Sequence, residues 1–215
     1  MNKINKMISK KNKIGMSLVE MIMAIAIFSI GIEGFSLLFV KSWKINSFVI
    51  EEGEASMMAS RGVQKIVDVA RRARQADNGS YPIVSANDND FIFYCDIDKD
   101  GVTERVHYYR NENSLLVGVT KPGGIPPVYS AGDQSVQVIA NYIANDVGHP
   151  IFSYYDENYP SDEVNNPMSV PASVSDIRMV KIHLMINIDP NNAPDYINIQ
   201  SFATLRNLNE YDRAD

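Results

Sequence analysis

A long apolar run follows the first, basic residues of the chain. Residues 16–40 read MSLVEMIMAIAIFSIGIEGFSLLFV and contain two acidic residues and no basic one. A helix over this run would be about 37 Å long at 1.5 Å per residue. That length is enough to cross a hydrocarbon core of roughly 30 Å. The run therefore predicts a transmembrane helix.

The next segment, residues 41–78, continues the helical pattern in amphipathic form. Its apolar residues recur three, four and seven positions apart, while arginine, lysine and aspartate cover the other face. The apolar stripe, which we expect to pack on a sheet, consists of Ala55, Met58, Ala59, Ile66, Val69, Ala70 and Ala73. Asp77–Ser80 and then Pro82 predict the end of the helix. One helix is expected from about Ser17 to Ala76.

Beyond residue 79 the pattern changes to that of strands. Val180, Ile182 and Leu184 alternate with polar residues, which is typical of a half-buried antiparallel strand. Comparable runs predict the strands Phe91–Asp96, Glu104–Arg110, Leu115–Thr120, Val136–Ala144, Ile151–Tyr155, Ile177–Ile188 and Tyr196–Arg206. Residues 156–175 predict a surface loop, and Pro190–Pro194 predicts a hairpin connection.

These patterns together predict an α+β fold in which a long N-terminal helix packs on a mostly antiparallel β-sheet. The expected division of the chain is a basic leader over 1–15, a transmembrane helix over 16–40, its amphipathic continuation over 41–78 and an extracytoplasmic β-rich head over 79–215. The head is long enough to bury a core of its own.

Charge is distributed unevenly along the chain. The formal net charge is −6, yet residues 1–15 hold five lysines and no acid, which leaves about −11 for the remainder. A basic excess before an apolar helix predicts that the amino terminus stays in the cytoplasm and that the body is exported. The acidic body argues against direct binding of nucleic acid. The single cysteine, Cys95, excludes an intramolecular disulfide and a cysteine-based zinc site.

Glu20 stands inside the apolar run, where a carboxylate costs on the order of 2.5–3.5 kcal/mol on insertion scales. The residues before it are Lys13, Ile14, Gly15 and Met16. This arrangement resembles the type IV prepilin signature, which has a short basic leader, a glycine, an apolar residue and a glutamate four positions later. The resemblance implies a membrane-embedded peptidase that cuts after Gly15 and methylates the new amine of Met16. It also implies that Glu20 offers a counter-charge to the amine of a neighbouring subunit.

Other interpretations of the amino terminus stay open. An ordinary signal peptide would have a shorter apolar core and a small-residue cleavage site on its far side. A plain transmembrane anchor would carry Glu20 incidentally. A second acid, Glu33, lies between Gly31 and Gly34 and departs from the usual pattern. It either extends into the lipid head groups or marks a point where the helix unwinds during packing.

Several stretches of the head also resemble the minor pseudopilin J and minor pilins of the PilW kind. They are Phe93–Gly101, Val106–Tyr109, Val138–Asn141 and Phe152–Asp156. The resemblance implies a subunit of a type IV pilus or type II secretion pseudopilus in the inner membrane. The implied partners are other pilin-like subunits, the prepilin peptidase, the inner-membrane assembly platform and membrane lipid. The C-terminal disulfide loop of many pilins is absent.

One loop has the pattern of a calcium ligand set. Asp96, Asp98 and Asp100 occupy alternate positions before a glycine, as at the start of a calcium-binding loop. The twelfth position, where an EF-hand has glutamate, is His107, and Glu104 stands at the ninth. Two interpretations remain: a small calcium-binding turn that uses these four acids, or a plain hairpin turn between two strands.

The sequence does not indicate an enzyme. His107, His149 and His183 are scattered, with no His-Glu-x-x-His helix and no Gly-x-Ser-x-Gly turn. The function that the resemblance implies is filament assembly, and no catalytic site or obligatory cofactor is expected. The alternative is a membrane-anchored extracytoplasmic binding or adhesion module, with or without calcium, that is never cut and does not polymerise.

Overall fold

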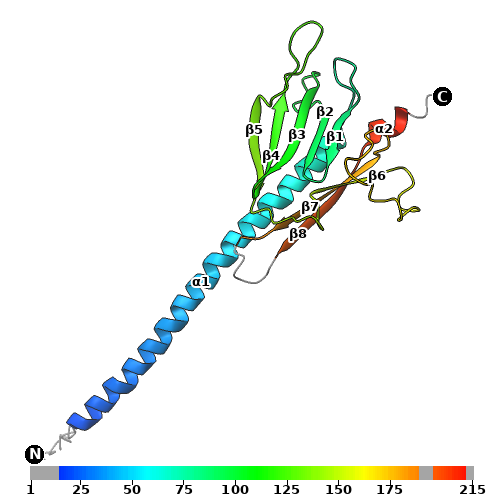
Figure 1. The fold of residues 1–215 in the computed structure, drawn as a ribbon. Coiled ribbons are helices and arrows are strands. Elements are labelled where there is room, and N and C mark those ends of the chain that lie inside the picture. The colour runs from blue at the N-terminus through cyan, green and yellow to red at the C-terminus, as the bar shows by residue number, and fades with distance from the viewer. Residues whose placement is uncertain (1–14, 189–195, 212–215) are drawn as a thin grey trace, which may run out of the picture. The chain divides into compact units, whose positions relative to one another are not determined.

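A computed structural model describes residues 15–188 and 196–211 of the chain (Figure 1). It contains two compact units, Met1–Val49 and Ile50–Asp215. Helix α1, Leu18–Ala70, begins in the first unit and ends in the second. All the strands belong to the second unit, which is called the head below. The leader residues 1–14 lie outside the described part of the chain.

The first part of α1 is exposed along its whole apolar length. All the large apolar side chains from Leu18 to Val40 are at least half exposed, with exposed fractions from 50% at Ile32 to 74% at Leu18. Its most apolar stretch has a mean hydropathy of 2.1, so by length and composition α1 can cross a membrane. The predicted helix is present, and its place in a membrane remains a prediction.

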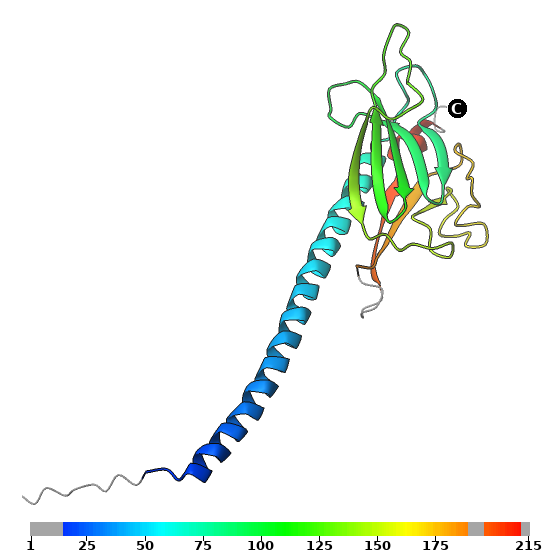
Figure 2. The ribbon, with the colours of Figure 1, turned by 60° about the vertical axis from the view of Figure 1, so that its left-hand side comes forward.

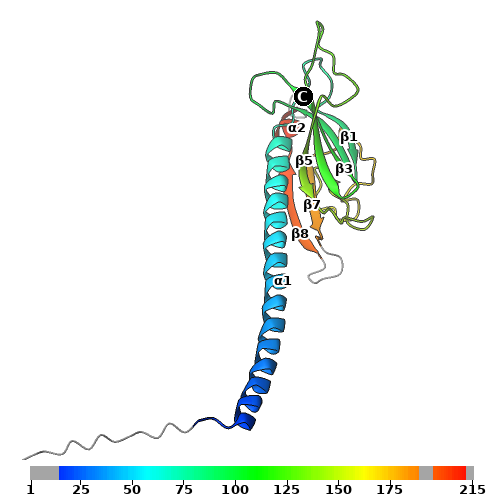
Figure 3. The same ribbon diagram turned by 90° about the vertical axis from the view of Figure 1, so that its left-hand side faces the viewer.

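The last turns of α1 are buried on one face. Ala59, Val63, Ile66 and Ala70 are at most 1% exposed, which confirms the apolar stripe in part. Met58 was predicted to face the sheet, but this prediction is wrong because its side chain is 47% exposed. Figure 3 shows these turns of α1 running alongside strands of the head.

The predicted end of α1 is also wrong. The helix stops at Ala70, six residues before Ala76. After it the backbone N–H of Arg74 donates to the carbonyl of Tyr94, in a strand, at 2.9 Å. The segment therefore leaves the helix because the sheet offers its backbone a partner, while Gly79, with φ of 85°, forms the later turn.

The first sheet of the head has five antiparallel strands in sequential order (Figure 2). Its strands are β1 (Ile83–Asn87), β2 (Asp90–Cys95), β3 (Glu104–Asn111), β4 (Ser114–Thr120) and β5 (Ser135–Asn141). Strand β1 was not predicted, because it is short, partly polar and irregular between Ile83 and Ser85. Its pairing with β2 decides its conformation.

The second sheet has three antiparallel strands, β6 (Phe152–Tyr155), β7 (Met179–Ile186) and β8 (Ile197–Thr204), in that order. The alternation predicted for β7 is confirmed, with Val180, Ile182 and Leu184 fully buried. The predicted hairpin connection at Pro190–Pro194 lies outside the described residues. Helix α2, Arg206–Tyr211, follows β8 where continued strand was predicted up to Arg206.

The chain passes from one sheet to the other at Tyr142. This residue has a left-handed φ of 61°, which ends β5 at Asn141 instead of the predicted Ala144. Ile143 then forms an isolated bridge with Ile186 of β7, and the N–H of Ala144 donates to the carbonyl of Met185. One sheet was predicted, but this change of direction at Tyr142 divides the strands into two sheets.

An aromatic cluster joins the two sheets. The ring of Phe91 in β2 lies 5.7 Å from that of Phe152 and 5.5 Å from that of Tyr154, both in β6. The Tyr154 hydroxyl donates to the carbonyl of Asn87 at 2.9 Å. Phe93 stacks at 6.0 Å on Tyr108 of β3. These contacts and the buried face of α1 form one core, which gives the expected α+β arrangement of a long helix on antiparallel sheets.

Candidate functional site

The candidate cleavage site lies directly before α1. Gly15, Met16 and Ser17 are exposed and non-helical, and helix α1 starts at Leu18. Among the described residues beyond its chain neighbours, no atom lies within 4 Å of the position that a Cβ on Gly15 would take. The bond between Gly15 and Met16 therefore stands in open, non-helical backbone outside the hydrogen-bonded turns of α1.

Glu20 has a local contact that the sequence interpretation did not include. Its Oε2 accepts a hydrogen bond from the backbone N–H of Ser17 at 2.9 Å. The Ser17 carbonyl accepts the first helical bond, from Met21, at 3.1 Å. Serine followed three positions later by glutamate is a capping-box pattern, which a search for helix starts would have found. A cut after Gly15 would leave this cap intact.

The polar groups within the apolar part of α1 are few. The Ser29 hydroxyl donates to the carbonyl of Ile25 at 2.8 Å, so its hydrogen-bonding capacity is met within the helix. Glu33 is exposed, and no atom lies close to the Cβ positions of Gly31 and Gly34 beside it. Such a helix can present its surface to lipid or to other apolar helices.

The predicted calcium loop connects β2 to β3. Strands β2 and β3 pair from Cys95 with Glu104 onward, so this segment connects a β-hairpin, as both interpretations of the loop require. Ligand oxygens of Asp96, Asp98 and Glu104 lie within 4.8 Å of one another. Asp100 lies in the same loop, and its Oδ1 accepts the Val102 N–H at 2.8 Å.

A lysine from another strand end reaches into this loop. Lys121, directly after β4, places its Nζ 2.9 Å from Asp98, 3.1 Å from Asp100 and 3.4 Å from Glu104. The hydrogen bond from Lys121 holds the pKa of Asp98 below its ordinary value, and the Asp98 and Asp100 carboxylates raise the pKa of Lys121. Sequence reasoning missed Lys121, because only the pairing of β3 with β4 brings it to the loop.

Glu104 differs from the other acids in its burial. The residue is 1% exposed, and its Oε2 accepts the N–H of Ile97 at 3.0 Å, while its Oε1 has no hydrogen-bond donor among the described residues. Oδ1 of Asp96 is likewise buried without a donor. Buried polar atoms in folded proteins nearly always have partners, so these two oxygens require an explanation.

The histidines do not form a catalytic arrangement with a nucleophile in the described residues. The His107 ring contacts Asp90 at 2.7 Å and Asp133 at 3.0 Å, and Arg105 lies 3.4 Å from Asp133. Asp133 fits over β4 because Gly118 has no side chain: a Cβ there would stand 2.2 Å from its carboxyl carbon. This charged cluster ties the segment before β5 to β3, which is a structural role.

Cys95 is buried at the end of β2. Burial raises the pKa of its thiol to about 11, with a smaller opposing effect of Arg72. The thiolate is the nucleophilic form of cysteine, and the raised pKa keeps the Cys95 thiol protonated near neutral pH.

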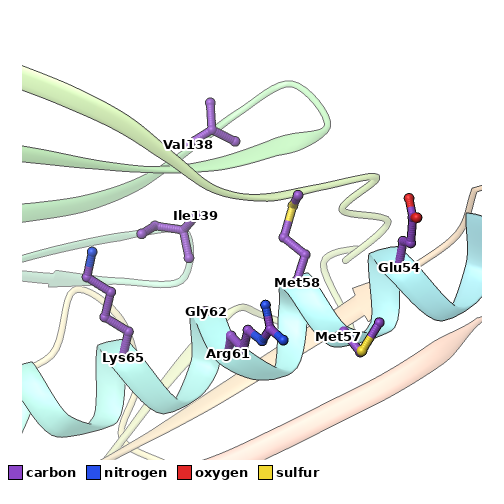
Figure 4. Close-up of a pocket in the computed structure, with 8 residues that line it drawn as sticks. All are labelled: Glu54, Met57, Met58, Arg61, Gly62, Lys65, Val138 and Ile139. Atoms are coloured by element: carbon purple, nitrogen blue, oxygen red, sulfur yellow. The ribbon is translucent and has the colours of Figure 1, made fainter.

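A groove runs along the head between α1 and β5 (Figure 4). Its apolar floor includes Met58, Val138 and Ile139, and Gly62 lies opposite Ile139. Glu54, Arg61 and Lys65 supply charged groups at its sides. Val136 and Val138 of β5 are about half exposed, so this side of the head offers an apolar surface.

Comparison with known protein families agrees with the sequence interpretation of the amino terminus. Residues 10–32 match the model of the prokaryotic N-terminal methylation motif, a stretch that includes Gly15, Met16 and Glu20. No curated protein matches the chain. The motif, the apolar helix that follows it and the antiparallel sheets of the head together support a type IV prepilin-like protein.

Proposed function

We propose that this chain is a minor pilin or pseudopilin that prepilin peptidase cuts after Gly15 and N-methylates at Met16. The processed subunit then assembles into a type IV pilus or a type II secretion pseudopilus. The observation that carries the proposal is the methylation motif at residues 10–32, which runs directly into an exposed apolar helix. The pseudopilin J and PilW-like group is the proposed subfamily, on the resemblance of its head segments.

The geometry around Glu20 supports a role in assembly. Its carboxylate lies 2.9 Å from the backbone nitrogen of Ser17, one residue from the amine that cleavage would create at Met16. A helix amino terminus carries partial positive charge, which disfavours a further cation. In an apolar surrounding, a carboxylate from the same or a neighbouring subunit would neutralise that amine and set the axial position of the subunit.

The proposed partners are other pilin-like subunits, the prepilin peptidase, the inner-membrane assembly platform and lipid. The lysine-rich leader keeps the amino terminus in the cytoplasm, and the head is exported. Neither a catalytic activity nor direct binding of nucleic acid is part of the proposal. The first unit supplies the anchor, and the head supplies the surface that faces neighbouring subunits.

The first experiment is expression of the full chain with and without an active prepilin peptidase, followed by intact-mass and amino-terminal analysis. We expect a product that begins at N-methylated Met16. Gly15→Ala should abolish the cut, because the resemblance assigns this glycine to the scissile bond. Gly31→Ala is the matched control, since both glycines stand in open space, and it should be cut normally.

A substitution at Glu20 can remove its negative charge and still keep its hydrogen bond to the Ser17 N–H at the start of α1. Glu20→Gln keeps an acceptor for the Ser17 N–H, since glutamine also serves in capping boxes, but it removes the charge. We expect this variant to be cut and to fail in filament assembly, as judged by electron microscopy of sheared filaments. Glu33→Gln, which removes the other acid of the helix, should still assemble.

One outcome would overturn the proposed function, and another would overturn only the role of the Glu20 charge. A chain that stays uncut beside a peptidase proven active on another substrate would make it an anchored binding module. Normal assembly of Glu20→Gln would show that the charge is dispensable and would leave Glu20 only its role at the helix start.

A further inference from the structure

The hairpin loop of the head brings carboxylate oxygens to the spacing of a shared cation. The candidate ligand atoms of Asp96, Asp98 and Glu104 lie within 4.8 Å of one another. Calcium binds oxygen at about 2.3–2.6 Å, so two ligands on opposite sides of one ion lie up to about 5 Å apart. One calcium ion can therefore reach all three side chains.

A second, independent observation comes from Glu104. This carboxylate is almost completely buried, and its Oε1 has no hydrogen-bond donor although it belongs to the cluster. Burying a charged group is costly unless it is paired and hydrogen-bonded. The Lys121 ammonium, at 3.4 Å, is an ion-pair contact that is too long for a strong charged hydrogen bond.

Charge in the loop is also unbalanced. The ion pairs of Asp96, Asp98, Asp100 and Glu104 within the described residues involve two cations, Lys121 and Arg74. Arg74 lies 3.7 Å from Asp96, and its guanidinium also donates to the Gly101 carbonyl and the Thr103 hydroxyl. A divalent cation in place of the single charge of Lys121 would bring the four acids and Arg74 from a net charge of −2 to −1.

Lys121 can leave the cluster without disturbing the core. Its side chain is 51% exposed, and those of Asp98 and Asp100 are 49% and 42% exposed. The segment that follows Lys121 has another tie to the hairpin, because the Tyr129 hydroxyl donates to the Thr103 carbonyl at 2.7 Å. Displacement of the ammonium would thus leave the two loops connected.

We propose that Asp96, Asp98 and Glu104 bind a calcium ion that displaces the ammonium group of Lys121. The ligands are all oxygens on one hairpin loop, which suits calcium better than zinc. Magnesium demands a stricter octahedral geometry at 2.0–2.1 Å, so it binds less tightly. Lys121 acts as a built-in competitor that sets the calcium concentration at which the loop fills.

The test is isothermal titration of calcium chloride into the full chain in detergent, after removal of metal with a chelator. Lys121→Met should bind calcium at least about tenfold more tightly than the unaltered chain, a change of about 1.4 kcal/mol. Asp98→Asn and Glu104→Gln should abolish binding. Asp162→Asn is the matched control, because Asp162 is a partly exposed loop aspartate outside the cluster, and calcium binding by this variant should be unchanged.

Folding of each variant is checked by circular dichroism and thermal unfolding without calcium. Asp98 is exposed, so its variant keeps the test valid even where Glu104→Gln fails to fold. Absence of calcium binding at millimolar concentration in both the unaltered chain and Lys121→Met would overturn the proposal. Equal affinity of those two proteins would overturn the competition by Lys121.

The calcium site stands apart from the proposed function. All its residues belong to the head, whereas Gly15, Met16 and Glu20 belong to the first unit. Asp98→Asn should therefore be cut after Gly15 like the unaltered chain. A failure of calcium binding and a failure of processing are thus observed separately.

Discussion

The two parts of helix α1 differ both in apolar content and in surroundings. From Leu18 to Val40 the large apolar side chains are at least half exposed, whereas Val63, Ile66 and Val67 near its end are at most 4% exposed. The first part is apolar on all sides, as a membrane or filament core requires, and the last part is apolar on one side only. One continuous helix is thus suited to an apolar environment in its first part and to the packed head in its last part, because the width of its apolar surface changes along its length.

A matched pair of phenylalanines, one in β2 and one in α1, should separate the core of the head from the exposed part of α1 most strongly. Phe93 is fully buried between Phe91 and Tyr108, and Phe28 is 69% exposed. Phe93→Ala should lower the free energy of unfolding of the head by about 3–5 kcal/mol, because it leaves a cavity. Phe28→Ala should leave it unchanged. Urea denaturation in detergent, followed by near-ultraviolet circular dichroism, measures both, and equal effects would contradict the separation of the exposed part of α1 from the core of the head.

A pair of glycines in the part of α1 that belongs to the head sharpens the comparison further. A Cβ on Gly62 would lie 2.7 Å from Cγ2 and 3.3 Å from the carbonyl oxygen of Ile139, while a Cβ on Gly53 meets nothing within 4 Å. Gly53→Ala should stabilise the head by up to about 1 kcal/mol, because alanine favours the helix. Gly62→Ala should destabilise it by about 1–2 kcal/mol, since β5 must move. Urea denaturation curves of the two variants measure these changes. A higher stability of Gly62→Ala would contradict the prediction and show that β5 can move without cost.

The smallest expected effect is a pH dependence of the head alone. Burial lowers the pKa of His183, and the nearby Lys181 and His149 act in the same direction, against the contact with Asn198. Below its ordinary pKa of about 6.5, His183 takes up a proton more readily in the unfolded chain than in the folded one. The stability of the head should therefore fall as pH drops from 7 through 6.

His183→Gln should flatten this slope, whereas His149→Gln, at an exposed position, should keep most of it. Thermal unfolding between pH 7 and 5.5 is the measurement. A slope that His183→Gln leaves unaltered would assign the pH dependence to another group.

Much of the fold could be predicted from local pattern. The start of α1 and strands β2, β3, β4 and β7 were predicted within a few residues, because helix and strand periodicity show directly which side of each element faces the core. The match to the methylation motif agrees with the predicted Gly15, Met16 and Glu20. The periodic elements and the motif depend on residues that are close together in the sequence.

What the sequence by itself determined is thus the apolar anchor, the prepilin-type motif and the strands with clear alternation. Only the tertiary structure decided that α1 ends at Ala70, that Tyr142 divides the strands into two sheets and that Lys121 enters the acidic loop. The physical reason is the same in each case. The decisive hydrogen bonds join residues that are distant in the sequence: Arg74 to Tyr94, Ala144 to Met185 and Lys121 to Asp98. No local pattern contains such a pairing.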